Sequence, residues 1–147
     1  MIPLRAFEEF LKDGIITKAT PNRMRADSLT AEAEKRKRFV KELLEKIKIS
    51  DENANYYIES AYDTIMELLR AKLIIDGYKS HGEGAHEAEI SYLRKIGFSE
   101  HDARFANALR YNRNGIKYYG KSFEKHYAES AISFLNEIYP KLRGLIK

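Results

Sequence analysis

Apolar side chains recur along this chain with the period of an α-helix. Val40, Leu43, Leu44 and Ile47 follow an i, i+3, i+4, i+7 spacing, which places them on one face of a helix. Similar spacing returns in most other segments, and no segment shows a convincing alternation with a period of two. The pattern therefore predicts an all-α protein.

Turn and capping residues divide the pattern into about five or six helices. Segment 15–25 contains a proline and is expected to be a connector, and segment 78–84 is expected to be a turn. Ser28 or Thr30 is expected to cap a long second helix, because serine and threonine side chains accept hydrogen bonds from the free amides of a helix start. The third and last helices have long apolar stripes, which either pair with each other or partly face a second subunit.

Two further helix starts are predicted from capping boxes. Ser80 with Glu83, and Ser99 with Asp102, have the spacing at which two side chains can satisfy the free amides of a helix start. Short connections between helices favour antiparallel neighbours. We therefore expect an antiparallel up-and-down helical bundle that forms a single domain over residues 1–147.

Composition narrows the class of protein. The chain has 147 residues, of which 44% are apolar and 33% are charged, as is usual for a folded domain. It has no cysteine, which excludes disulfides, thiolate catalysis and cysteine-based zinc sites. No segment resembles a signal peptide or a membrane span, so we expect a cytoplasmic protein with no membrane partner. Abundant Lys and Glu are also a feature of thermophile proteins.

Positive charge is concentrated near the C-terminus. The formal net charge of the chain is +4, yet residues 104–126 hold six lysines or arginines against one glutamate. This segment includes the sequence RYNRNGIKYYGKSFEKH, residues 110–126. Such a segment attracts phosphate groups, although a solvated helix face has the same composition. Charge alone leaves both interpretations open.

The spacing of the basic residues adds to the phosphate interpretation. If the fifth helix continues past Gly115, Arg110, Arg113 and Lys117 lie on one face, where guanidinium groups can hold a phosphate through paired hydrogen bonds. Glycine in a helix interior costs about 1 kcal/mol relative to alanine, so a helix that ends before Gly115 is the alternative. Continuation of the helix is left open at this point.

Aromatic and amide side chains accompany these cations. Tyr111, Tyr118 and Tyr119 can stack on bases or pack into a core, and Lys121 adds positive charge. Asn114 carries an amide that can both donate and accept hydrogen bonds. Together with the arginines, these residues form a candidate binding site for phosphate or nucleic acid.

The histidines give no metal site. His81 and His86 are five residues apart, which is the wrong spacing for two ligands on one helical face. His101 lies in the first turn of one expected helix, and His126 lies in the last helix. The chain contains neither an HExxH nor a GxSxG motif, so we expect no metal, no cofactor and no serine hydrolase triad.

Two stretches together resemble the HEPN family of small helical proteins. They are AYDTIMELLRAKLIIDGYKSHGEGAHEAEISYLRKIGF (61–98) and LRYNRNGIKYYGKSF (109–123), and the resemblance extends over about residues 51–146. It implies an up-and-down bundle, usually a homodimer, with an arginine motif near the dimer cleft. Many members of that family are metal-independent ribonucleases, often toxins, whereas others accompany a nucleotidyltransferase partner protein or only bind.

The catalytic motif of the HEPN family is an arginine, commonly followed by a polar residue, and then a histidine that is separated from the arginine by about four to six residues. Arg113 and Asn114 match the first two positions, but Tyr118 stands where the histidine is expected at the shortest spacing. The longer spacings hold no histidine either, and the next one is His126. Tyrosine has a pKa of about 10 against about 6.5 for histidine, so it is a poor base near neutral pH.

Three functional hypotheses follow. The first is an RNA- or nucleotide-binding homodimer of a toxin–antitoxin or nucleotidyltransferase type of module, with Arg113 as the main phosphate contact. The second is a metal-independent endoribonuclease that uses Arg113 with a tyrosine or a displaced histidine. The third is a dimeric interaction module without a nucleic-acid role.

Overall fold

The structure, a computed structural model of the chain, describes residues 2–146. Over these residues it contains six helices and one two-stranded sheet. In chain order the elements are α1 (Phe7–Lys12), β1 (Ile16–Lys18), α2 (Arg23–Lys46), α3 (Ala54–Ile75), β2 (Tyr78–Ser80), α4 (Ala85–Lys95), α5 (Glu100–Tyr119) and α6 (Lys125–Gly144). The predicted all-α class and the number of helices are confirmed.

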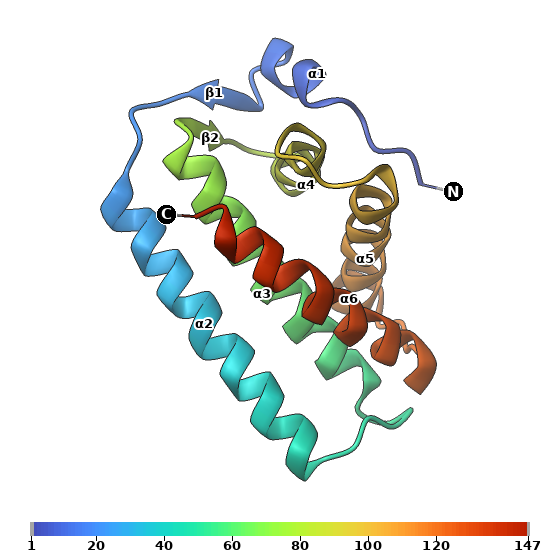
Figure 1. Cartoon of the computed structure of the whole chain (residues 1–147). Helices are drawn as coiled ribbons and strands as arrows, with labels where there is room; N and C mark the ends of the chain where they lie inside the picture. Colours follow the sequence, from blue (N-terminus) through green and yellow to red (C-terminus); the bar gives the residue numbers. More distant parts are fainter. Residues whose placement is uncertain (1, 147) are drawn as a thin grey trace.

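Four long helices form the up-and-down bundle. Figure 1 shows α2 and α5 running in one direction and α3 and α6 in the other, with α4 as a short helix between α3 and α5. Helix α3 is central and packs mainly against α2 and α6. The long apolar stripes of the third and last helices therefore pair with each other, which is one of the two arrangements that the sequence left open.

Small residues allow the helices of this bundle to approach closely. Ala26 and Ala33 of α2, Ala61 of α3, and Ala128 and Ala131 of α6 are all fully buried, and small side chains at a helix contact shorten the distance between the axes. Larger apolar side chains fill the space around them: Ile58, Ile65, Leu68, Leu69, Leu109, Leu135, Ile138 and Leu142. Close packing of this kind is the main source of stability in a helical domain.

The start of α2 corrects one prediction. The helix begins at Arg23, because the side chain of Asn22 caps it by accepting a hydrogen bond from the amide of Arg25 (3.0 Å). Ser28 and Thr30 lie inside the helix, where each hydroxyl donates to the carbonyl oxygen four residues earlier (3.1 and 2.8 Å). The expected cap at Ser28 or Thr30 was therefore wrong, since Asn22 already serves the helix start.

The two short strands were not predicted. β1 and β2 pair antiparallel, with Ile16 opposite Ser80 and Lys18 opposite Tyr78. Three residues are too few to show the alternation that identifies a strand, and the partners are about sixty positions apart in the chain. The expected connector and turn therefore each contain a strand, and together these strands tie α1 and α2 to the end of α3.

The two predicted capping boxes had different outcomes. The hydroxyl of Ser99 accepts a hydrogen bond from the amide of Asp102 (3.1 Å) at the start of α5, so this helix start is confirmed. At the start of α4, by contrast, the cap position is occupied by Gly84 in a left-handed conformation. Ser80 instead donates to the carboxylate of Glu89 (2.7 Å), and the box with Glu83 was wrong.

Candidate functional site

Helix α5 continues through the segment that the sequence singled out. It runs to Tyr119 and ends at Gly120, which adopts the left-handed conformation (φ 64°) that glycine takes easily. The carbonyl of Gly115 accepts hydrogen bonds from the amides of both Gly120 and Lys121. Gly115 is buried, and a Cβ added there would lie 2.9 Å from Cδ of Lys121. The Lys121 side chain therefore packs directly on the backbone at Gly115.

A surface hollow of about 560 Å³ lies at this end of α5, and we call it the tyrosine hollow. Its lining residues are Tyr111, Asn114, Gly115, Tyr118, Tyr119 and Lys121. The side chains of Tyr111, Tyr118 and Tyr119 are exposed at 49%, 64% and 79%, which is unusual for three large rings close together. Five predicted site or stacking residues are thus brought together in one place.

Lysines lie beside the rings of the tyrosine hollow. The amino group of Lys121 lies 5.8 Å from the ring centre of Tyr111, and that of Lys117 lies 5.5 Å from the ring centre of Tyr118. Both distances are within the range of cation–π attraction. The hollow therefore combines accessible aromatic faces with two exposed cations.

The chain that follows the tyrosine hollow is held by the start of α3. The side chain of Asn55 donates to the carbonyl of Lys121 (2.9 Å) and accepts from the amide of Phe123 (3.0 Å). The carboxylate of Asp51 accepts from the amide of Lys125 (2.8 Å), which is the first residue of α6. These contacts fix the loop between α5 and α6, which contributes Lys121 to the lining of the hollow.

Arg113 lies on the neighbouring face of α5 and points toward α3. Its side chain is 14% exposed, and one terminal nitrogen lies 3.5 Å from the half-buried carboxylate of Asp63. The guanidinium carbon is 5.2 Å from the ring centre of Tyr62. Within residues 2–146, Nε of Arg113 and the hydroxyl of Tyr62 are buried without a hydrogen-bond partner. Arg113 thus already has one acid beside it but keeps donor capacity.

Arg110 and Lys117 share this face with Arg113, as the spacing predicted. Nε of Arg110 donates to the side chain of Asn107 (3.0 Å), whereas Lys117 is exposed. Burial raises the pKa of the Tyr62 hydroxyl well above its usual value, although the charges of Arg113 and Arg110 act in the opposite direction. The hydroxyl of Tyr62 therefore stays protonated, as a donor next to two arginines.

Three charged residues lie on one face of α3 and form ion pairs with other helices, and we call this set of residues the α3 stripe. Asp63, Glu67 and Arg70 follow an i, i+4, i+7 spacing, which places them on one face. Asp63 pairs with Arg113 of α5, Glu67 pairs with Arg36 of α2 (2.7 Å), and Arg70 pairs with Glu89 of α4 (2.9 Å). Sequence reasoning missed this stripe, although polar residues at helical spacing within a mostly apolar helix were a visible signal.

Three of the four histidines lie outside this arrangement. His126 is exposed near the start of α6 and lies 3.5 Å from Glu124, His81 is hydrogen-bonded to Thr17 (2.8 Å), and His101 is exposed on α5. No group of three metal-ligating side chains occurs among the described residues.

His86 is the histidine whose pKa is affected by the arginines of the candidate site. It lies at the start of α4. Desolvation is the largest cause that lowers its pKa, and the charges of Arg70, Arg113 and Arg110 lower it further. Glu89 acts in the opposite direction. Sequence analysis treated His86 only as a possible metal ligand beside His81. It missed the arginines near His86 because their proximity depends on how α4 packs.

Comparisons with known proteins add no relative: no family model, no curated protein and no solved structure matches the chain. Between residues 2 and 146, no helix is both long and apolar enough to cross a membrane. The site is therefore interpreted from its own geometry.

Proposed function

We propose that the protein is a HEPN-type RNA- or nucleotide-binding protein, and that its binding surface is the tyrosine hollow with the adjoining basic face of α5. The observation that carries this proposal is the gathering of three exposed tyrosine rings, an asparagine and a lysine around one hollow. Proteins that bind single-stranded nucleic acids combine exposed aromatic rings with cations in this way.

Stacking and charge would have separate roles on this surface. Each base that stacks on an aromatic ring contributes about 1–3 kcal/mol to binding, and Tyr118 and Tyr119 have the most accessible rings. Lys117 and Lys121 would attract the phosphate backbone, and this contribution weakens as salt rises. Arg113, with Arg110 nearby, would hold a phosphate at the inner edge of the surface.

The direct test is a binding titration of short fluorescent single-stranded RNAs, followed by anisotropy at several salt concentrations. We expect Tyr118→Ala with Tyr119→Ala to weaken binding by about tenfold or more. Lys121→Gln should reduce the slope of affinity against salt by roughly 0.7. The matched control is Phe39→Ala, which removes an exposed ring from α2 and should leave binding unchanged. Equal binding by the wild type and the double tyrosine variant would refute the proposal.

The role of Arg113 has its own test, because Asp63 already lies 3.5 Å from it. A phosphate would have to compete with that carboxylate. Asp63→Asn should therefore tighten RNA binding if Arg113 contacts phosphate, whereas Arg113→Ala should weaken it. If neither change affects affinity while both lower the thermal stability, Arg113 serves only to join α5 to α3.

We propose a homodimer as the binding unit, because the HEPN resemblance implies a homodimer with the arginine motif near the dimer cleft. Sedimentation velocity of the wild type and of the double tyrosine variant tests this. A dimer in both, with RNA binding lost only in the variant, supports the binding surface. A dimer that separates in the variant, together with no RNA binding by the wild type, supports the alternative of an interaction module.

A ribonuclease activity is a second proposal, and the surroundings of His86 favour it. Its lowered pKa keeps the imidazole neutral near pH 7, as a general base requires, and Arg113 would stabilise the charged phosphorane. Pure protein should then cleave single-stranded RNA in the presence of EDTA, and both His86→Ala and Arg113→Ala should remove the activity. Intact RNA over a range of pH would exclude this reaction.

The setting of a toxin–antitoxin module with a nucleotidyltransferase partner is supported only by the family resemblance. It predicts that the neighbouring gene encodes a nucleotidyltransferase and that the two chains co-purify after joint expression. Separate elution of the two proteins would refute this part without affecting the RNA-binding surface.

A further inference from the structure

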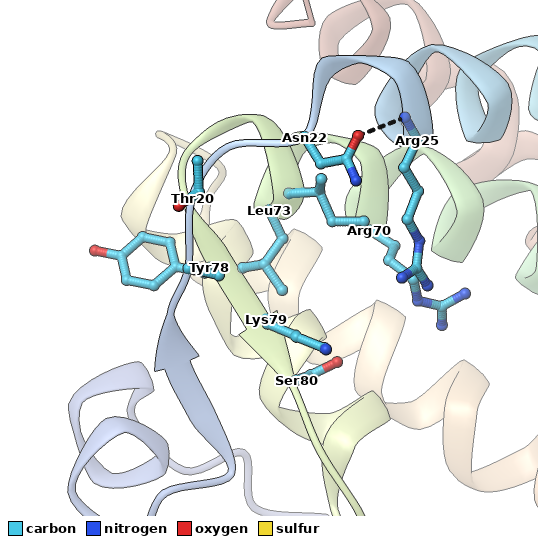
Figure 2. A pocket seen from close by; sticks show the side chains of 10 residues that line it. Thr20, Asn22, Arg25, Arg70, Leu73, Tyr78, Lys79 and Ser80 are labelled. Atoms are coloured by element: carbon cyan, nitrogen blue, oxygen red, sulfur yellow. Dashed lines mark hydrogen bonds between the residues drawn. The ribbon is translucent and has the colours of Figure 1, made fainter.

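A second hollow lies at the opposite end of α3 from the tyrosine hollow, and we call it the strand pocket. It has a volume of about 230 Å³ and lies between β2, the end of α3 and the start of α2. Its polar lining comes from Thr20, Asn22, Arg25, Arg70, Lys79 and Ser80, with an apolar part that includes Leu73 and Ile74. Figure 2 shows that Arg25, Arg70 and Lys79 come from three separate elements, α2, α3 and β2.

The lining of the strand pocket has three cations and no carboxylate. Arg25, from the first turn of α2, and Lys79, from β2, are exposed and have no ion-pair partner within residues 2–146. In Figure 2, Arg25 and Arg70 extend alongside each other, and the Lys79 side chain is directed toward them. Repulsion between the two unpaired cations, Arg25 and Lys79, is relieved when an anion lies between them.

Arg70 is held in place by a carboxylate that lies behind it. Its Nε and Nη2 donate to the two oxygens of Glu89 (3.0 and 2.9 Å), and Ser80 donates to the same carboxylate (2.7 Å). Glu89 is only 1% exposed, so it positions Arg70 without itself lining the pocket. Nη1 of Arg70 has no partner among the described residues, which leaves a rigid guanidinium with a free edge.

Backbone geometry brings the start of α2 to this place. Gly77 has a positive φ of 87°, and a Cβ there would lie 3.1 Å from the carbonyl oxygen of Ala19. The amide of Ala19 donates to the carbonyl of Gly77 (2.8 Å), next to the β1–β2 pairing. Asn22 then caps α2, whose first turn has no acidic residue. The positive end of the helix dipole thus adds to the three cations.

We propose that the strand pocket binds a small organic phosphate, meaning a phosphate monoester with a small apolar group. Guanidinium groups bind phosphate oxygens with paired, charge-assisted hydrogen bonds, and Leu73 and Ile74 would contact the apolar group. The ring of Tyr78 turns away and packs on Phe7 and Tyr92 (5.2 and 5.7 Å), so base stacking is not part of this site. The volume is below the range of about 300–1,000 Å³ for drug-sized ligands, which favours a compact ligand.

Isothermal titration of the full chain tests this, with phenyl phosphate as the probe and phenol and inorganic phosphate as comparisons. We expect phenyl phosphate to bind with a dissociation constant of about 10 mM or lower. Inorganic phosphate should bind more weakly, and phenol should not bind. Arg25→Gln with Lys79→Gln should weaken binding by about tenfold or more, because each removes a charge-assisted hydrogen bond. Both side chains are exposed, so this variant should fold.

The matched control is Arg38→Gln with Lys41→Gln, which removes two exposed cations from the same helix α2 outside the pocket. This control should bind phenyl phosphate like the wild type. Any one of three results overturns the proposal. They are no binding of phenyl phosphate to the wild type, an equal loss of affinity in the control variant, or binding of inorganic phosphate as tight as that of phenyl phosphate.

The strand pocket is independent of the RNA-binding proposal, and a crossed experiment keeps the two apart. The pocket variant should bind single-stranded RNA like the wild type, and the double tyrosine variant should bind phenyl phosphate like the wild type. If RNA displaces phenyl phosphate, or if the pocket variant loses RNA affinity, the cations belong to an RNA track and the small-molecule site is refuted. Failure of RNA binding alone leaves the phenyl phosphate result intact.

Discussion

The ion pair between Arg70 and Glu89 gives the sharpest stability prediction. Glu89 is 1% exposed and accepts two hydrogen bonds from Arg70 and one from Ser80, whereas the Arg70 side chain is 27% exposed. The hydrogen bond to Glu89 raises the pKa of Arg70, so the cation persists at any accessible pH. Removing either partner alone leaves a charge without its counter-ion, but at different depths in the protein.

The two single substitutions should therefore have unequal effects. Breaking a buried ion pair costs about 3–5 kcal/mol. Arg70→Met leaves a carboxylate that water cannot reach, and we expect it to lower the free energy of unfolding by about 4 kcal/mol. Glu89→Gln leaves a partly exposed guanidinium that water can solvate, and we expect a loss of about 2 kcal/mol. Replacing both, as Arg70→Met with Glu89→Leu, should return stability to within about 1 kcal/mol of the wild type.

Urea denaturation followed by far-ultraviolet circular dichroism measures these differences. The reasoning fails if Glu89→Gln is the more damaging change, or if both single variants lie within about 0.5 kcal/mol of the wild type. Either result would mean that water reaches the carboxylate.

Three further changes test local features. Gly115→Ala should stabilise the fold by about 0.5–1 kcal/mol, because only the flexible side chain of Lys121 must move; a lower melting temperature would show that Lys121 cannot yield. Hydrogen bonds from two arginines lower the pKa of Glu100 to about 2. The contribution of Glu100 to the stability of the fold is therefore present above about pH 4.3 and is lost toward pH 2. Urea titrations of Glu100→Gln across that range should not show this loss. Asn22→Ala should lower the free energy of unfolding by about 1 kcal/mol, and Asn22→Asp should lower it much less. An equal loss of stability in the two variants, measured by chemical denaturation, would argue against the cap.

Helices were predictable from sequence where a long apolar stripe meets a capping residue. The start of α5 at Ser99 is such a case, since its hydroxyl caps the helix as predicted. The start of α2 was misplaced because serine and threonine inside a helix can bond to the preceding turn, as Ser28 and Thr30 do. A capping residue type by itself therefore does not locate a helix start.

The candidate site was predictable in its residues but not in its division into two faces. The helical spacing correctly grouped Arg110, Arg113 and Lys117, yet it could not show that Arg113 turns inward to Asp63. Nor could it show that the loop after Gly120 folds back and makes a hollow around the tyrosines. Both features depend on contacts with α3 that span 50 or 66 positions of the sequence, from Asp63 to Arg113 and from Asn55 to Lys121.

The α3 stripe explains why Arg113 differs from Arg36 and Arg70, the other two arginines in its ion pairs. The pairs of Glu67 with Arg36 and of Arg70 with Glu89 have nitrogen–oxygen distances of 2.7 and 2.9 Å, so in both pairs the carboxylate lies close to its arginine. Arg113 is 3.5 Å from Asp63, and its Nε has no partner among the described residues. A buried donor without a partner is costly to keep, and this cost is relieved when an acceptor arrives. The loosest pair of the stripe is therefore the one that can exchange its acid for an external anion.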